Sequence, residues 1–137
     1  MAVMFTALRT ILLALIVVAA PLPAAADDLE EFAVAVERAE LQYRMALRTL
    51  ETAGREETLA EVALFRQAWH EVITRLDNHR PAQFEDDSYY AATMTEIDTV
   101  LVGVMIVIDI GSREGARAAL TPIGEKLAKL RDRVERR

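Results

Sequence analysis

The sequence Thr99–Ile110, TVLVGVMIVIDI, decides the fold of this chain. The nine residues from Val100 to Ile108 carry no polar side chain, and Asp98 and Asp109 stand on either side of them. Such a run has to be covered on nearly every side, because apolar surface is unfavourable in water. It is therefore either the central element of a hydrophobic core or a surface that a partner covers.

Valine and isoleucine are abundant in this run, and their β propensity alone favours a strand. The rest of the chain has apolar residues at spacings of three and four, which is typical of amphipathic helices. Because a lone strand would have no pairing partner among helices, we predict a helix from Asp87 or Ser88 to residue 110. We expect Gly103 to mark the close approach of a neighbouring helix, since glycine costs about 1 kcal/mol in a helix interior. The buried stripe of this helix should be Tyr90, Met94, Ile97, Leu101, Val104 and Ile108.

Three further stripes predict helices over residues 28–53, 56–79 and 113–137. The first stripe is Leu29, Phe32, Val36, Ala39, Tyr43, Ala46 and Leu50. The second is Val62, Phe65, Trp69, Val72, Leu76 and His79, and the last is Ala116, Leu120, Ile123, Leu127, Leu130 and Val134.

Capping residues mark where these helices should begin and end. Asp28 with Glu31 resembles a capping box, and Gly54 stands where a left-handed residue after a helix is expected. Gly111 and Ser112 read as the end of one helix and the N-cap of the next. Pro122 either kinks the last helix or begins its main segment with Thr121 as the cap. Because two of the three connections are short, residues 27–137 should form an all-α, antiparallel up-down-up-down four-helix bundle.

Residues 1–26 have the pattern of a secretory signal peptide. Arg9 precedes the apolar run Ile11–Ala20, and Ala24 and Ala26 satisfy the A-x-A cleavage pattern. The alternative is an uncleaved membrane anchor, but the apolar run is short of the roughly 20 residues that span a bilayer. We therefore expect a periplasmic or secreted protein with no stable membrane span after cleavage.

The composition excludes several classes of site. The chain has no cysteine, which excludes disulfides, thiolate metal sites and covalent c-type haem. Without the leader, which contains Arg9, the chain has 15 basic and 22 acidic residues, so its net charge is −7. A net acidic chain is a poor candidate for nucleic-acid binding. Ser88 and Ser112, the only serines, both stand at cap positions, so nucleophilic catalysis has little support.

Metal binding depends on the only two histidines, His70 and His79. Neither belongs to an HExxH or Glu-x-x-His motif. Counting levels along antiparallel helices places His70 near Glu40, Met94 or Asp98, and Lys126. One hypothesis is therefore a site for copper, iron or haem that uses His70 or His79 together with Met94 or a carboxylate such as Asp98. In the structural interpretation, His79 caps its helix and packs on the tyrosines that open the next, while His70 lies on a solvated flank.

The chain resembles the exported four-helix cytochromes of the c-prime and soluble b types. The shared features are the leader, four helices of similar length, aromatic-rich early helices and a basic last helix. This resemblance implies haem held by a CxxCH motif or a histidine near the chain's end, often opposite a first-helix methionine. Residues 113–137 contain neither cysteine nor histidine, and Met45 lies further along its helix than that family's ligand. No haem ligand therefore carries over to this chain.

These features favour a non-enzymatic exported bundle that binds a protein partner or a small ligand, with no cofactor. Val102, Met105 and Val107 lie off the predicted buried stripe, so we expect self-association, or an envelope protein partner, through this helix. The alternative function is a periplasmic metal- or haem-binding protein in redox or metal handling.

Overall fold

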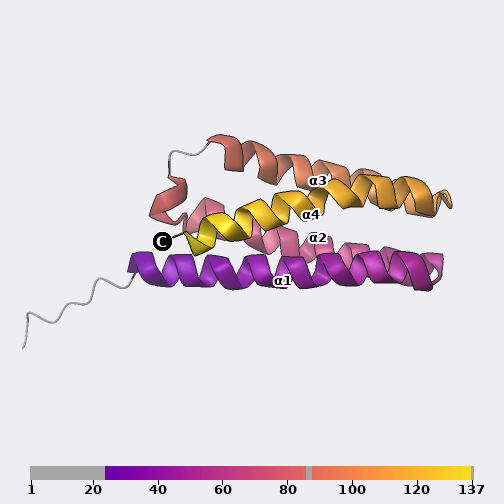
Figure 1. Ribbon diagram of the computed structural model, residues 1–137, viewed down its shortest axis with the longest axis horizontal. Coiled ribbons are helices and arrows are strands. Elements are labelled where there is room, and N and C mark those ends of the chain that lie inside the picture. The colour runs from indigo at the N-terminus through magenta and orange to yellow at the C-terminus, as the bar shows by residue number, and fades with distance from the viewer. Residues whose placement is uncertain (1–23, 86–87, 137) are drawn as a thin grey trace, which may run out of the picture.

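The computed structural model describes residues 24–85 and 88–136, which are almost entirely helical. In chain order the elements are α1 (Ala24–Thr52), α2 (Arg55–Asn78), the short 3-10 helix η1 (Ala82–Phe84), α3 (Ser88–Asp109) and α4 (Arg113–Glu135). The four long helices lie side by side along the long axis of the molecule (Figure 1). The prediction of an all-α chain of four helices is confirmed for the described residues, and the run 99–110 is helical as far as Asp109.

Each helix packs against two neighbours: α1 and α3 both contact α2 and α4. The α1–α2 and α3–α4 connections lie at one end of the bundle, whereas η1 and the end of α4 lie at the other (Figure 1). Phe84 of η1 is buried between the rings of Phe32 and Tyr90, with centroid distances of 5.2 and 5.1 Å. The 3-10 helix therefore closes the hydrophobic core at that end.

The core is made from the predicted stripes. Every predicted stripe residue of α3 and α4 is buried, and so are the apolar stripe residues of α2. In α1, Leu29 and Tyr43 are half-buried while the other five are buried. Spacings of three and four place these residues on one side of each helix, which explains why the pattern located the core. His79 is the exception, because its side chain is 59% exposed instead of lying on the buried stripe.

The caps predicted at Gly111 and Ser112 are confirmed, whereas those predicted at Gly54 and Asp28 are wrong. Gly111 has a φ of 92°, and the Ser112 hydroxyl accepts a hydrogen bond from the Gly115 N–H at 3.2 Å. Gly54 is instead extended, with φ −77° and ψ 173°, because it serves as the N-cap of α2. The capping box at Asp28 is also wrong, since α1 already begins at Ala24.

Helix α4 runs without a break through Pro122. The Thr121 hydroxyl donates to the Arg117 carbonyl at 2.8 Å, so it bonds back into the preceding turn and does not cap a new helix. The alternative of a helix beginning at Thr121 is therefore wrong.

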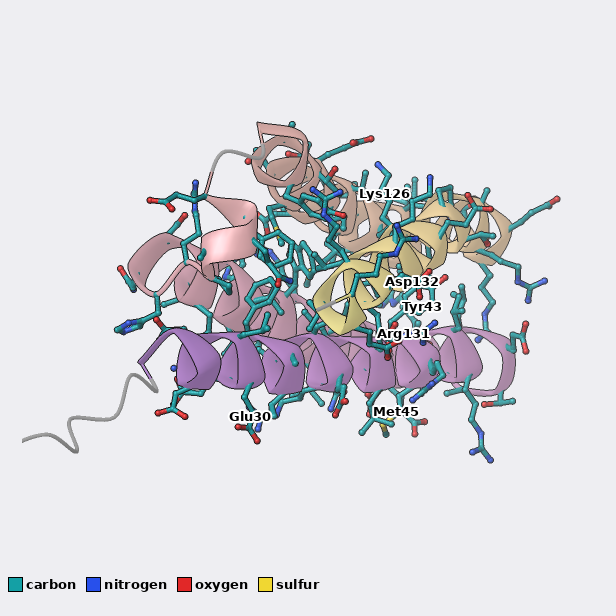
Figure 2. All side chains as sticks on the ribbon, turned by 60° about the vertical axis from the view of Figure 1, so that its left-hand side comes forward. Glu30, Tyr43, Met45, Lys126, Arg131 and Asp132 are labelled. Atoms are coloured by element: carbon teal, nitrogen blue, oxygen red, sulfur yellow. The ribbon has the colours of Figure 1, made fainter. Side chains whose placement is uncertain are left out.

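Tyr43 ties α1 to this part of α4. Its hydroxyl donates to the Leu120 carbonyl at 3.0 Å, and Figure 2 shows Tyr43 on the side of α1 that faces α4. Burial raises the pKa of the Tyr43 hydroxyl, and the hydrogen bond with the Gly124 backbone offsets this only in part. A Cβ at Gly124 would lie 2.7 Å from the Tyr43 oxygen. Gly124 therefore makes room for the tyrosine ring.

The expectation for Gly103 is wrong within this chain. Gly103 is exposed, and a Cβ added there would meet no atom of residues 24–85 and 88–136 within 4 Å. At Gly115, by contrast, a Cβ would meet the Ser112 hydroxyl at 2.8 Å. The close approaches are thus made at Gly115 and Gly124, both in α4.

The predicted signal peptide, residues 1–26, lies outside the described residues except for residues 24–26, which begin α1. Among the helices of residues 24–85 and 88–136, none combines the length and the apolar character needed to cross a membrane.

Candidate functional site

Two of the predicted metal ligands, His70 and Asp98, are brought together between α2 and α3. The His70 Nε2 lies 2.7 Å from Asp98 Oδ1, and the Arg66 Nε donates to the same oxygen at 3.3 Å. Burial raises the pKa of the Asp98 carboxyl, but the hydrogen bonds and charges of His70 and Arg66 outweigh it. The pKa of Asp98 therefore lies below its ordinary value, as expected for a carboxylate that is hydrogen-bonded and lies beside a guanidinium.

The other two predicted ligands lie elsewhere. The His79 Nδ1 is 3.9 Å from Asp28 Oδ1, at the end of α2. His79 does end that helix, but through its backbone N–H, which donates to the Arg75 carbonyl, while its imidazole is largely exposed. Met94 is only 3% exposed, and its carbonyl accepts a hydrogen bond from the Trp69 indole at 3.1 Å. The thioether of Met94 is thus part of the core.

The described residues contain no group of three or more His, Cys, Asp or Glu side chains placed to hold a metal ion. His70 and His79 are nine residues apart on one helix, which is roughly 13 Å along the axis. The oxygen of Asp98 that faces His70 also faces the Arg66 guanidinium, a cation that a metal would have to displace. The arrangement is that of a surface histidine beside a carboxylate that forms an ion pair with Arg66.

The level count also predicted that Glu40 and Lys126 lie near His70, but both residues pair with other side chains. Glu40 pairs with Arg131 at 3.3 Å, and Lys126 pairs with Glu96 at 2.5 Å. Figure 2 shows Arg131 between α1 and α4. A level count gives the height of a residue along the bundle but not the face on which it lies, so residues at equal height were placed together wrongly.

The outward side of α3 has an unusual composition. Val102, Ile106 and Ile110 follow one another at intervals of four and are 39%, 59% and 75% exposed. Residues four apart stack on one side of a helix, so these three form a continuous apolar stripe. We call the exposed, uncharged set on this side the outer face of α3, and it consists of Ala92, Thr95, Thr99, Val102, Gly103, Ile106 and Ile110. From Ala92 to Ile110 this face is about 27 Å long at 1.5 Å per residue.

Two of the carboxylates beside this face, those of Asp98 and Glu96, are held in ion pairs. On one flank Asp98 is paired with Arg66 and His70, and on the other Glu96 is paired with Lys126. At the end of α3, Arg55 donates to the carbonyl of Asp109 at 3.2 Å. The outer face is therefore an uncharged strip with ion pairs on both flanks, and the exposed Asp109 stands at its C-terminal end.

The predicted interface residues fall partly on this face. Val102 is exposed on it, whereas Met105 and Val107 are half-buried at its edges. Met105 lines a cavity of about 240 Å³ together with Ala63, Arg66, Gln67 and His70. Sequence reasoning missed Ile106 and Ile110, although counting in steps of four from Val102 would have found both.

A second set of exposed apolar side chains lies on α1 and α2, but it is interrupted by charge. Val34, Leu41 and Met45 are exposed on α1, and Leu64 is exposed on α2. The hollow beside Val34 and Leu41 is also lined by Glu37, Arg38, Glu40 and Arg44. In Figure 2, Met45 and Glu30 project from the side of α1 that faces away from the bundle. This surface has the mixed character of an ordinary solvated helix.

Comparison of the chain with protein-family models, with curated proteins and with solved structures found no match.

Proposed function

We propose that this chain is an exported, non-enzymatic four-helix bundle that associates with a second copy of itself through the outer face of α3. The observation that carries this proposal is the exposed stripe of Val102, Ile106 and Ile110, which contains no charged residue. Charged residues make up 28% of the chain. An exposed strip of this length without a charged residue is therefore more typical of a surface that contacts another protein than of one that faces water.

The proposed bundle has antiparallel up-down-up-down order. Contacts between the start of one helix and the end of its neighbour support this order. Arg113, the first residue of α4, donates to the Leu50 carbonyl near the end of α1 at 3.2 Å. Arg55, the first residue of α2, donates to the Asp109 carbonyl at the end of α3. Export to the periplasm or the outside is supported by the signal-like pattern of residues 1–26.

Self-association is tested by sedimentation velocity of the purified protein over a wide concentration range. The test variant is Ile106→Glu, and the matched control is Leu41→Glu, which places the same charge at a 48% exposed apolar position on α1. Burying the exposed 59% of Ile106 is worth roughly 1–2 kcal/mol. A two-fold contact contains this residue twice, so we expect the dissociation constant to rise at least about thirty-fold.

The control should leave the dissociation constant within about threefold of the original protein. A protein that sediments as a monomer at millimolar concentration would refute the proposal. If Ile106→Glu and Leu41→Glu raise the dissociation constant equally, the assignment of the contact to α3 is refuted.

The second candidate function is metal or haem binding in the periplasm, and the close pair of His70 and Asp98 favours it. We expect a metal site that uses this pair to retain stoichiometric copper, iron or zinc in protein purified from its native compartment. It should lose the metal on His70→Ala but not on His79→Ala, since His79 lies beside Asp28. Metal content unaffected by both substitutions would exclude the histidines as ligands.

A further inference from the structure

The helical glycines of this chain differ in their surroundings. In α4, Gly115 and Gly124 each make room for a side chain, at 2.8 and 2.7 Å from where a Cβ would be. Gly103 lies in the middle of α3, and a Cβ there would meet nothing within 4 Å. Among the described residues only Gly111 has a positive φ, so the backbone at Gly103 does not require glycine either.

Glycine is the least favourable residue in a helix interior apart from proline, because it has no side chain to restrict the unfolded chain. Contacts among the described residues give no reason for a glycine at position 103. The position of Gly103 does give a reason, because it lies on the outer face of α3, four residues after Thr99 and three residues before Ile106. A residue without a Cβ in the middle of an apolar helix face lets a second helix approach at close range.

We propose that Gly103 is the point at which α3 of a second copy of this chain crosses the outer face of α3. This inference rests on the proposed function, and it specifies the residue at the centre of the contact. A two-fold axis near Gly103 would bring the two glycines together and let Val102 and Ile106 of each copy pack on both sides of the crossing.

A second copy fits this surface better than a charged partner does. The whole chain has a net charge of −6, so two copies repel wherever acidic residues face each other. The seven residues of the outer face are uncharged, and two of the carboxylates beside it, those of Asp98 and Glu96, are paired with Arg66 and Lys126 within the same copy. A neutral apolar strip is complementary to itself, which is what a two-fold contact requires.

The experiment compares Gly103→Ala with Gly54→Ala by sedimentation velocity and by urea unfolding. Gly54 is a matched control, because a Cβ there also meets nothing within 4 Å, and it lies between α1 and α2. We expect Gly103→Ala to raise the dissociation constant about tenfold or more, because the added methyl groups collide at the crossing. Gly103→Leu should raise it further, and Gly54→Ala should leave it unchanged.

The unfolding measurement separates a lost contact from a damaged fold. At a concentration where the protein is monomeric, Gly103→Ala should unfold at a higher urea concentration than the original protein, because alanine favours the helix. A variant that is more stable as a monomer yet associates more weakly would support the crossing. If the protein associates and Gly103→Ala associates equally well, the crossing is refuted while self-association stands. If the original protein does not associate at all, both are refuted.

Discussion

The contact between Gly124 and Tyr43 predicts that Gly124→Ala destabilises the protein, although alanine is the better helix former. The added Cβ would lie 2.7 Å from the Tyr43 oxygen and 3.0 Å from two atoms of its ring. Ordinary contact begins at 3.4 Å, so the hydroxyl would have to withdraw by about 0.7 Å. That movement disturbs its hydrogen bond to Leu120 and its ring contact with Phe65, whose centroid is 5.6 Å away.

The expected magnitude follows from three terms. Overpacking costs about 1–3 kcal/mol, and a weakened hydrogen bond costs about 1 kcal/mol. The gain in helix propensity returns about 1 kcal/mol. We therefore expect the free energy of unfolding of Gly124→Ala to fall by about 1–3 kcal/mol, whereas Gly103→Ala, which has open space, should raise it by about 0.5–1 kcal/mol.

The assay is urea unfolding followed by circular dichroism, at a concentration where the protein is monomeric. A double-mutant cycle with Tyr43→Leu removes the hydroxyl and the outer ring atoms that the new methyl group would meet. In that background Gly124→Ala should be neutral or stabilising. The reasoning is refuted if Gly124→Ala stabilises the original protein as much as Gly103→Ala does, or if Tyr43→Leu does not change its effect.

Three further predictions follow from the sequence and the contacts described above. Expressed in an exporting bacterial host, the chain should lose residues 1–26, so intact mass spectrometry should show a protein that begins at Asp27. Because the pKa of Asp98 is lowered in the folded state, its contribution to stability is present above its ordinary pKa of 3.8 and is lost as the pH falls through the folded pKa. Asp98→Asn should therefore lower the urea midpoint at pH 7 and have little effect near pH 2, and an equal effect at both pH values would contradict this. Ser112→Ala removes the hydroxyl that accepts from Gly115 and should cost about 1 kcal/mol in urea unfolding, whereas a neutral result would mean that the cap contributes nothing.

The fold was predictable from the sequence because burial follows helical periodicity. The stripe from Tyr90 to Ile108 was located correctly even though its valines and isoleucines favour a strand. Burial of this stripe against α2 and α4 outweighs the local β propensity of these residues. The ends of the helices were harder to predict, because Gly54 could end α1 or begin α2, and only the backbone geometry decides between the two.

The candidate site was predicted less well, because its geometry depends on which sides of neighbouring helices pack against each other. The pairing of His70 with Asp98 followed from the level count, but Met94 was placed with them although it points into the core. The outer face of α3 was recognised as surplus apolar surface through Val102, yet its most exposed residues, Ile106 and Ile110, were not named. Sequence alone does not show where the boundary between buried and exposed lies on a helix that is apolar all round.

The hydrogen bond from Trp69 to the Met94 carbonyl has a practical consequence. Trp69 is the only tryptophan of the chain, and it is fully buried where α2 meets α3, on the side of α3 opposite the exposed stripe. Its fluorescence emission should therefore report the separation of these two helices and remain unchanged when whole molecules come together or part. Unfolding can thus be followed by the emission of Trp69, without attaching a dye, in a sample whose molecules also dissociate, because the dissociation does not change this signal.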